Sequence, residues 1–417
     1  MSEIIAISTE IGRGHPNYLD NFLQQIDDKR KISYISVFEK CQGASFFAWK
    51  TVASLYIIGS KGGLVTRIYN LIRFFSKDTS KKSPFLCLLG RDLKRTLRNF
   101  DGICVVEHPL MAKALCDVCS VFYLHGEIAA PAECVIKGAK KIFVPLEETK
   151  KKLVSFGADP NSIVVTGLMI EPPLVDSAEK YFEERTARIN SNWPLTVGFF
   201  TSGAYPKEHI SKILAGAKSV IKHGMKAILF LGTNLKVYQK VKEALLPPRS
   251  SFTNLSVEPR RKALGRRPLG VAQMGETDGQ EGEMEEFPGE TNWDISLVRG
   301  ETRQEATLKE IKFLPRLDVF VAASHERTNW AVGLGLPMFV LFPHIGTYAP
   351  LNFEFAEKQG VVFALKTSKD AENLGRIIRE LRINGTLAEM TRRGFGGFKI
   401  DGFETAGETF RQKLRML

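Results

Sequence analysis

The chain has 417 residues and a formal net charge of +12, and its 44% hydrophobic and 25% charged residues are ordinary for a globular protein of two or three domains. The positive charge favours anionic partners such as nucleic acid, anionic lipid or a phosphorylated substrate, and it does not choose among them. The start, MSEIIAISTE, lacks the basic segment of a signal peptide, and the one long uncharged run, 329–353, is interrupted by glycine and proline, so we expect a cytoplasmic protein.

The cysteine pattern does not favour a metal site. All six cysteines lie in the first third of the chain, and Cys116 and Cys119 form a CxxC without a second such pair to complete a zinc site. The chain also contains no Asp-x-Asp and no HExxH motif. We therefore expect reduced, mostly buried thiols, no bound metal and no other resident cofactor.

Short apolar strands alternate with helices along the first half of the chain, which is typical of a mostly parallel sheet. Pro16 can begin a helix after the first strand, because the first helical position needs no backbone N–H. The predicted domain covers 1–172 and is followed by a linker helix at 173–194. Its strands are predicted at 4–8, 32–37, 103–106, 121–124, 142–144 and 163–166.

Residues 44–98 stand apart within this half. They contain an aromatic and aliphatic cluster, and from Lys61 to Arg98 there are ten Lys or Arg against two Asp. Basic residues that flank apolar ones suit a helix lying on an anionic membrane surface. A core helix with a solvated basic face is the alternative interpretation.

A second alternating series predicts another doubly wound domain over 195–400. Its strands are predicted at 195–200, 227–231, 295–298, 317–322, 338–342 and 361–364, with helices at 206–222, 350–358 and 368–383. The segment 247–292 interrupts this domain, because it has no apolar period and runs from a basic to an acidic block, which predicts a disordered insert. A last helix, 401–417, can pack on either domain.

Polar residues stand at several strand ends of the first domain. Gly12 and Gly14 form a glycine loop, and His15 follows it in a position suited to a general base. Asn17 occupies the place of the third glycine of a dinucleotide fingerprint, so we expect neither a nicotinamide nor a flavin site. Two later strands end in Glu107-His108 and in His125-Gly126-Glu127. The candidate catalytic residues are His15, His108 and Glu127, with His125 on the acceptor side.

The second domain offers candidate ligand contacts at equivalent places. Thr201, Ser202 and Gly203 follow its first strand, where hydroxyls and backbone N–H groups before a helix suit a diphosphate. A second set of candidate contacts lies between a strand and a Gly-rich helix start, and it consists of His325, Glu326, Arg327, Thr328 and Asn329. Ligands of open α/β sheets bind at such carboxyl ends of strands.

Taken together, these motifs resemble the GT-B glycosyltransferases, and within them the monogalactosyldiacylglycerol synthases and the bacterial UDP-GlcNAc transferase of lipid II synthesis. The resemblance covers most of the chain except 44–98 and 247–292. It rests on IGRGHPNYLDNF (11–22), EHPLMAKAL (107–115), VVTGLMIEPPL (164–174), VAASHERTNWAVGLGLPMFVLFP (321–343) and LNFEFAEKQGVV (351–362).

The resemblance implies two doubly wound Rossmann-like domains that face each other across a cleft, with a C-terminal helix that crosses back. It implies metal-independent, inverting transfer of a sugar from a nucleotide-sugar, with a UDP-sugar expected, to an acceptor on the first domain. Thr201 to Ala204 would face the diphosphate, and Asn352 would contact the donor. Two positions depart from the family pattern, because Trp330 stands where the ribose-binding Glu is expected and Tyr348 replaces a Gln.

Three functions remain open at this point. The leading one is a glycosyltransferase whose acceptors include lipids at an anionic membrane surface, which would place the protein on the inner face of a membrane. The alternatives are a sugar-nucleotide 2-epimerase, which shares the fold, and a non-catalytic relative that binds a sugar-nucleotide or a lipid. No specific nucleic-acid partner is expected, since the basic residues form no recognisable motif.

Overall fold

The structure is a computed structural model, and it describes residues 3–12, 14–26, 32–59, 84–245, 285–286 and 295–415. The predictions made for 60–83 and for nearly all of 247–292 lie outside the described residues, as does Arg13 of the glycine loop. No helix within the described ranges combines the length and the apolar character needed to cross a bilayer.

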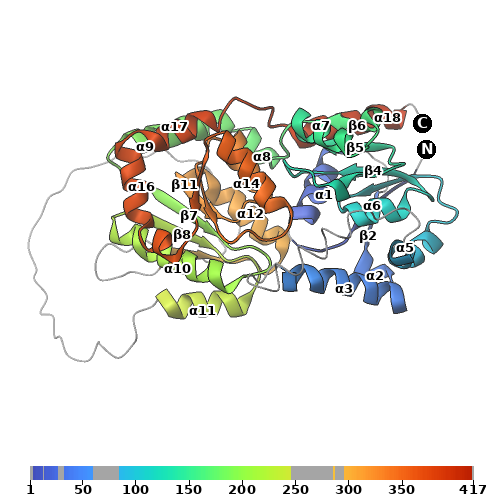
Figure 1. The fold of residues 1–417 in the computed structure, drawn as a ribbon, viewed down its shortest axis with the longest axis horizontal. Helices are drawn as coiled ribbons and strands as arrows, with labels where there is room; N and C mark the ends of the chain where they lie inside the picture. The colour runs from blue at the N-terminus through green and yellow to red at the C-terminus, as the bar shows by residue number, and fades with distance from the viewer. Residues whose placement is uncertain are drawn as a thin grey trace, which may run out of the picture.

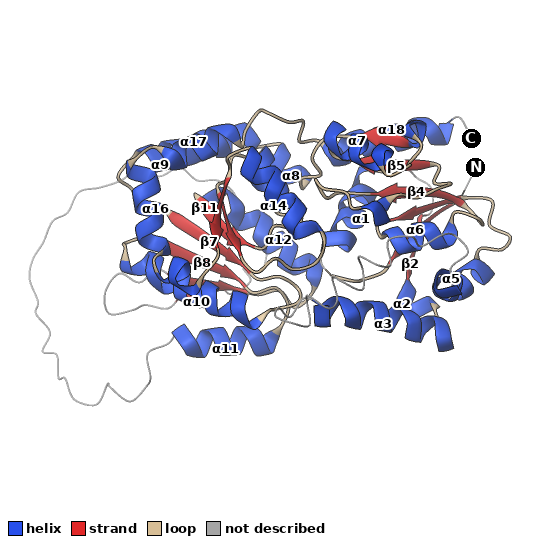
Figure 2. Ribbon diagram, viewed as in Figure 1, coloured by secondary structure: helices blue, strands red, loops and turns tan. Residues whose placement is uncertain are grey.

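The first domain is built on a parallel sheet of six strands in the order β2-β1-β3-β4-β5-β6 (Figures 1 and 2). All six agree with the predicted strands to within one residue at each end. They are β1 (Ile4–Ser8), β2 (Ile32–Ser36), β3 (Ile103–Val106), β4 (Ser120–Leu124), β5 (Lys141–Val144) and β6 (Ile163–Val165).

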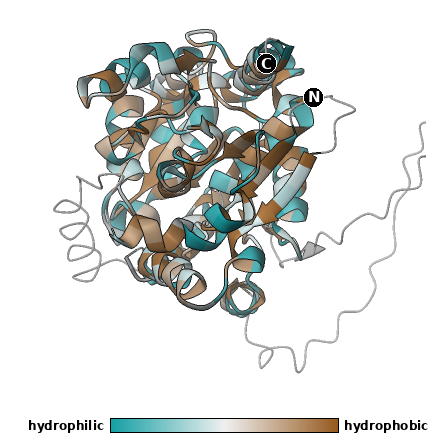
Figure 3. Ribbon diagram, turned by 90° about the vertical axis from the view of Figure 1, so that its right-hand side faces the viewer, coloured by the Kyte–Doolittle hydropathy of each residue, from teal (hydrophilic) through white to brown (hydrophobic). Residues whose placement is uncertain are grey.

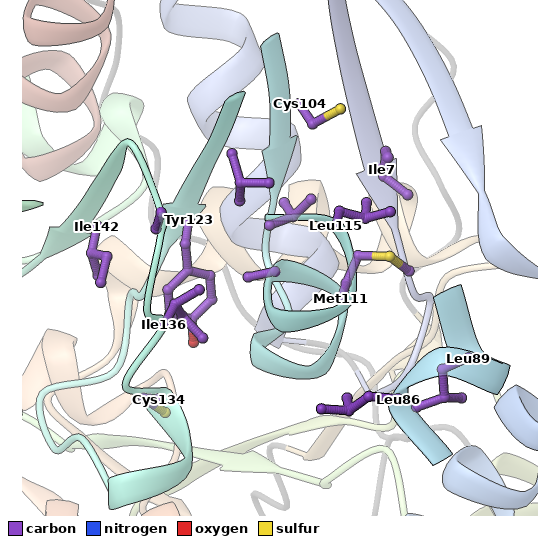
Figure 4. Close-up of a cluster of buried hydrophobic side chains, with 14 of the residues drawn as sticks. Ile7, Leu86, Leu89, Cys104, Met111, Leu115, Tyr123, Cys134, Ile136 and Ile142 are labelled. Carbon is purple, nitrogen blue, oxygen red and sulfur yellow. The ribbon is translucent and has the colours of Figure 1, made fainter. Parts of the chain in front are cut away.

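Both faces of this sheet are covered, which explains why its strands are apolar throughout. Alternate residues of a strand point to opposite faces, so that Ile5 and Ile7 belong to one core cluster, and Ile4 and Ala6 to another. Figure 4 shows part of the first cluster, with Cys104 on β3 above Met111 and Leu115 of a neighbouring helix. The helices of this domain are α1 (Gly14–Gln25), α2 (Val37–Lys40), α3 (Gly43–Gly59), α5 (Pro84–Thr96), α6 (Pro109–Leu115), η1 (Ala132–Cys134), α7 (Glu147–Ser155) and η2 (Pro160–Ser162).

The second domain repeats this plan with a sheet in the order β13-β12-β11-β7-β8-β10-β9. Six strands are parallel, and the two-residue β9 (Glu285–Glu286) pairs antiparallel with β10. The parallel strands are β7 (Thr196–Phe200), β8 (Lys226–Phe230), β10 (Ile295–Val298), β11 (Val319–Ala322), β12 (Met338–Leu341) and β13 (Val362–Leu365).

Helices cover both faces of the second sheet as well. The helix predicted at 368–383 forms two shorter helices instead. Asn373 lies between them, as the C-cap residue of the first and the N-cap residue of the second. The remaining elements are α8 (Pro172–Val175), α9 (Ala178–Asn190), α10 (Lys207–Lys222), α11 (Leu235–Leu245), α12 (Arg303–Phe313), η4 (Leu314–Arg316), α13 (Thr328–Gly333), α14 (Tyr348–Lys358), α15 (Ser368–Glu372), α16 (Leu374–Ile383) and α17 (Thr386–Arg393).

The two domains lie side by side, and the last helix returns from the second domain to the first (Figure 1). This helix, α18 (Gly402–Arg415), packs on α1, and its Phe403 and Phe410 complete the core of the first domain. The prediction of two doubly wound domains with a helix that crosses back is therefore confirmed. Viewed from the side of the first domain, the interior strands are largely hydrophobic and the outer faces of the helices are more hydrophilic (Figure 3).

Candidate functional site

Each sheet has a topological switch point, where the strand order changes direction. β1 pairs with both β2 and β3, and β7 pairs with both β8 and β11. Ligands of doubly wound sheets bind beyond the carboxyl ends of the strands at such points. In this chain the two switch points face each other, because residues at the two edges are joined by hydrogen bonds between the domains.

The glycine loop lies at the first switch point, and both of its glycines permit a close approach. A methyl group on Gly12, which has a φ of +74°, would lie 3.2 Å from the hydroxyl of Tyr56 on α3. One on Gly14 would lie 3.2 Å from Oε2 of Glu326, which belongs to the second domain. The sequence therefore needs small residues here to bring the loop against its neighbours.

Glu107 is the most enclosed acid of the site. Its Oε1 accepts hydrogen bonds from the backbone N–H of Thr9 at 2.7 Å, and from the hydroxyls of Thr9 and Ser8 at 3.1 Å each. Its Oε2 is buried and has no hydrogen-bond partner among the described residues. Burial raises the pKa of Glu107 to about 7, so that its carboxyl group can exchange a proton near neutral pH.

Three histidines predicted from separate strand ends are brought together. The ring of His15 lies 5.2 Å from that of His108 and 6.1 Å from that of Tyr348, measured between centroids. The ring of His125 lies 6.1 Å from the same Tyr348, which belongs to α14 of the second domain. Burial, followed by the charge of His15, lowers the pKa of His125 to about 3, so His125 is neutral at pH 7.

Glu127 joins the two domains through Asn352. The amide of Asn352 donates to Oε2 of Glu127 at 2.7 Å and to the carbonyl of Ser324 at 3.1 Å, and its Oδ1 accepts from the N–H of Ala129 at 3.0 Å. Burial, and then the nearby carboxylate of Glu326, raise the pKa of Glu127 to about 8. Glu127 is therefore mostly protonated at neutral pH and can donate a proton.

The predicted donor segment, residues 325–329, makes contacts both within the second domain and to the first domain. Arg327 donates to both oxygens of Glu310, at 3.2 and 3.0 Å, and its guanidinium lies 4.8 Å from the ring centre of Phe200. Asn329 donates to the carbonyls of Gly126 and Met169 of the first domain, at 3.2 and 3.3 Å. Arg327 is thus held within the second domain, whereas Asn329 supports the interface between the two domains.

Trp330, at the position where the resemblance places an acid, also lies between the domains. Its Nε1 donates to Oε2 of Glu171 at 2.9 Å, and the amide of Asn17 on α1 donates to the other oxygen of Glu171 at 3.1 Å. Glu171 was not among the predicted site residues. Its signal in the sequence is an acid directly before Pro172-Pro173, where the chain leaves the first domain.

A cavity of about 220 Å³ opens between the glycine loop, α3 and the second domain. Thr201 and Gly203 line it, as does Gly12, while the predicted His325 to Asn329 and Asn352 do not. The other lining residues are Glu10, Ile11, Ala53, Tyr56, Ile57, Tyr205, Gly232, Thr233, Arg303 and Ala306.

The cavity walls hold strained backbone. Among the described residues, only Glu10 and Tyr205 are non-glycine residues with a positive φ, at 52° and 47°, and both line this cavity. Strained backbone conformations cluster at ligand sites, because the surrounding structure must hold them. Arg303, at the start of α12, supplies a cation and is itself bound to Asp20 of the first domain at 2.7 Å.

Buried polar atoms without a partner concentrate at this interface. Of the twelve such side-chain atoms among the described residues, nine lie on the strand ends, loops and following helices of the two facing edges. Leaving a buried polar atom without a hydrogen bond costs about 1–3 kcal/mol, so a group of them indicates that a ligand or ordered water completes the site. These nine belong to Tyr18, Glu107, Ser202, His209, Arg303, His325, Arg327, Thr328 and His344.

The described part of the chain contains no group of three or more His, Cys, Asp or Glu residues that could hold a metal ion. The six cysteines are all free thiols.

Comparison with known proteins identifies the fold. No protein-family model matches the sequence, and no curated protein matches it. Solved structures do match over the full length of the chain, at low identity. S. aureus MnaA, solved with UDP, has a TM-score of 0.55 at 12% identity, covering 100% of this chain and 98% of its own. The UDP-GlcNAc 2-epimerase of Neisseria meningitidis, bound to UDP-GlcNAc, has a TM-score of 0.53 at 11% identity, covering 100% of both chains.

A glycosyltransferase also appears among the similar structures. MurG of Acinetobacter baumannii matches with a TM-score of 0.52 at 10% identity, covering 99% of this chain and all of its own. At such identities the likeness concerns the fold and leaves the reaction open. The chain therefore has the two-domain GT-B fold that the sequence motifs predict.

Proposed function

We propose that the chain binds a nucleotide-sugar between its two domains and transfers the sugar to an acceptor. The observation that carries this proposal is the set of nine unpartnered buried polar atoms on the facing edges of the two sheets. A polar ligand with several hydroxyl and phosphate oxygens would complete such a set at once.

A UDP-sugar is the proposed donor. Thr201, Gly203 and Arg303 supply a hydroxyl, open backbone and a cation to the cavity on the side of the second domain. Open backbone N–H groups and an arginine suit a diphosphate, and Arg303 would share its charge between the diphosphate and Asp20. UDP and UDP-GlcNAc are the ligands of two of the similar structures.

The proposed chemistry is a single displacement with inversion. His15, in the first turn of α1 beside His108 and Tyr348, would accept the proton of the acceptor hydroxyl. The acceptor oxygen would then attack the anomeric carbon as the bond to the diphosphate breaks, and UDP would leave with the electron pair. His125 and Glu127 stand beside this position and would orient the acceptor.

A lipid at an anionic surface is the proposed acceptor class. Ala53, Tyr56 and Ile57 of α3 line the cavity, while Phe47 and Leu55 of the same helix are 66% and 45% exposed. One helix thus offers an apolar surface next to the cavity, which would let a lipid headgroup enter while its chains stay in the membrane.

The test is nucleotide release from a panel of UDP- and GDP-sugars in the presence of anionic liposomes. We expect release with at least one UDP-sugar, and loss of about 100-fold or more in His15→Ala with donor affinity little changed. His223→Asn is the matched control, because His223 lies outside the site, bonded to the carbonyl of Ser219. Retained turnover in His15→Ala would remove His15 as the base.

A 2-epimerase is the second candidate, and a specific observation favours it. Glu107 and Glu127 are two buried carboxyl groups whose pKa values lie at about 7 and about 8, as proton exchange at a sugar carbon requires. Incubation with UDP-GlcNAc in D₂O without an acceptor separates the candidates, because an epimerase would incorporate deuterium at the sugar carbon. Nucleotide binding without release or exchange would indicate a non-catalytic binding protein.

A further inference from the structure

Glu10 lines the cavity between the domains, and no step of the proposed reaction uses it. Among the described residues around this cavity, Glu10 is the only one with a negative charge, and Arg303 is the only one with a positive charge. Glu10 is exposed, so its carboxylate is accessible to a ligand in the cavity.

The backbone at Glu10 is strained, and hydrogen bonds hold it in that conformation. Its φ of 52° lies in the left-handed region, which a residue with a side chain adopts only at a cost. The N–H of Glu10 donates to Oγ of Ser8 at 3.2 Å, and that hydroxyl donates to the buried Glu107 at 3.1 Å. Glycine would adopt the same conformation without strain. The chain thus places a carboxylate where glycine would fit better, which is common where a ligand is bound.

The carboxylate of Glu10 can accept further hydrogen bonds. Its Oε1 accepts from the hydroxyl of Tyr34 on β2, at 3.4 Å. This distance exceeds the usual separation of about 2.5–3.0 Å between two hydrogen-bonded oxygens, so the contact is weak. A carboxylate has about four acceptor positions on its two oxygens, and two adjacent hydroxyl groups can therefore bind to it side by side.

Two tyrosines form walls of the same cavity, one from each domain. Tyr56 of α3 lies against Gly12, where an added methyl group would stand 3.2 Å from its hydroxyl. Tyr205 donates its hydroxyl to the carbonyl of Leu231 at 3.2 Å, and a methyl group on Gly232 would stand 2.5 Å from that hydroxyl. The two glycines thus let both rings pack close to the backbone. Each ring offers an apolar face, which suits the C–H groups of a sugar ring.

The charge of Glu10 determines which part of a nucleotide-sugar it can bind. Such a ligand offers phosphate oxygens, hydroxyl groups and the N–H of a base. The carboxylate would repel the phosphates, which suit Arg303 instead. The base offers a single N–H, whereas two adjacent hydroxyl groups match both oxygens of a carboxylate.

We propose that Glu10 binds a pair of adjacent hydroxyl groups of the donor, and thereby selects nucleotide-sugars that carry such a pair. This inference rests on the proposed function, in which the donor lies in this cavity. Two parts of a nucleotide-sugar carry adjacent hydroxyl groups, namely the ribose and the transferred sugar. The contact with the carboxylate has the same chemistry in both cases, and the experiment distinguishes them.

The experiment is isothermal titration calorimetry of the full chain with UDP-GlcNAc, with UDP, and with a UDP analogue that lacks both ribose hydroxyls. Glu10→Gln should bind UDP-GlcNAc about tenfold more weakly than the wild type, because the hydroxyls lose a charged acceptor. If Glu10 binds the ribose, UDP should lose as much affinity in the variant, while the analogue should bind both chains equally. If Glu10 binds the transferred sugar, UDP should bind both chains equally.

Glu10→Gly adds a readout that separates ligand binding from a structural role. Relief of the strain at φ 52° offsets the greater freedom of glycine in the unfolded chain, so the variant should melt no lower than the wild type. Its affinity for UDP-GlcNAc should nevertheless fall about tenfold. Glu147→Gln, exposed at the start of α7, is the control and should match the wild type in both measurements. A lower melting temperature together with weaker binding would make Glu10 a structural residue and overturn the inference.

The remaining outcomes separate this inference from the proposed function. Equal affinities of the wild type and Glu10→Gln for both UDP and UDP-GlcNAc would remove the role of Glu10 and leave nucleotide-sugar binding intact. Tighter binding by Glu10→Gln would also overturn the inference, because it would place the carboxylate beside the phosphates. The same holds if the analogue loses as much affinity as UDP in the variant, which would indicate a contact with the base. Absence of UDP-GlcNAc and UDP binding in a folded wild-type chain would overturn both proposals.

Discussion

At the scale of single residues, the site is defined by polar atoms held in place with one side left open. Glu107 illustrates this arrangement, since three hydrogen bonds fix one carboxylate oxygen and none reaches the other. A buried carboxyl group held in this way is costly when ionised, which is why its proton is retained to about pH 7. The burial of Glu107 therefore has two consequences. It lets the carboxyl group exchange a proton near pH 7, and it makes the stability of the chain depend on pH.

Glu107→Gln should therefore change how stability depends on pH. The ordinary pKa of 4.5 is raised to about 7 in the folded chain, so the wild type keeps its full stability below pH 4.5 and loses part of it as pH rises to about 7. The loss from this one group is up to about 3 kcal/mol. Urea unfolding at about pH 5 and about pH 8 should give a smaller difference for Glu107→Gln than for the wild type.

Glu147→Gln serves as its control, because Glu147 is exposed at the start of α7. An unchanged pH difference in Glu107→Gln, equal to that of Glu147→Gln, would show that Glu107 ionises normally in the folded chain.

At the scale of elements, α3 is unusual because it is apolar around its whole circumference and yet partly exposed. One side is anchored, with Trp49 and Ser45 donating to the carbonyl of Leu89 on α5 at 3.0 and 3.1 Å. Lys50 is the only charged residue of the helix, and exposed arginines of α5 lie on the neighbouring element. An apolar helix beside cations suits the surface of an anionic membrane.

Phe47→Ser combined with Leu55→Ser should weaken binding to vesicles that contain anionic lipid. Both side chains are exposed, so their loss should leave the melting temperature nearly unchanged while the vesicle partition coefficient falls about tenfold. Co-sedimentation measures this directly. Trp193→Ser is the matched control, since Trp193 is 70% exposed in the second domain. Equal partitioning of the double variant and the control would contradict a role of α3 at membranes.

The elements themselves were predictable, and much of the site was not. Strands such as Ile103–Val106 are buried on both faces and bounded by turns, so a short apolar run was enough to identify them. Polar residues after such strands, among them His15 and Glu127, were found because the strand end alone marks them. Glu171 and Arg303 were missed, because each has a partner in the other domain, Trp330 and Asp20 respectively, and no local pattern records such a partner.

At the scale of the whole molecule, the two domains are joined through the same edges that would receive a ligand. Asn352 reaches Glu127, Trp330 reaches Glu171, and Arg303 reaches Asp20. These contacts join the facing edges of the two domains, and we call this joined arrangement closed. A ligand that enters between the edges must replace some of the contacts. Glu127 and Glu326 also influence each other at these edges. Their two negative charges would repel, unless one of the carboxyl groups keeps its proton.

The closed arrangement should therefore weaken as pH rises. In the closed chain Glu127 keeps its proton to about pH 8, whereas a solvated Glu127 in separated domains would release it near its ordinary pKa of 4.5. Between these values the separated form binds fewer protons, so the free energy that favours closure falls with increasing pH. Small-angle X-ray scattering should give a larger radius of gyration at about pH 9 than at about pH 5.

Glu127→Gln, which keeps an oxygen to accept from Asn352 and cannot ionise, should abolish most of this change, whereas Glu147→Gln should retain it. An expansion of equal size in Glu127→Gln would place the responsible group elsewhere.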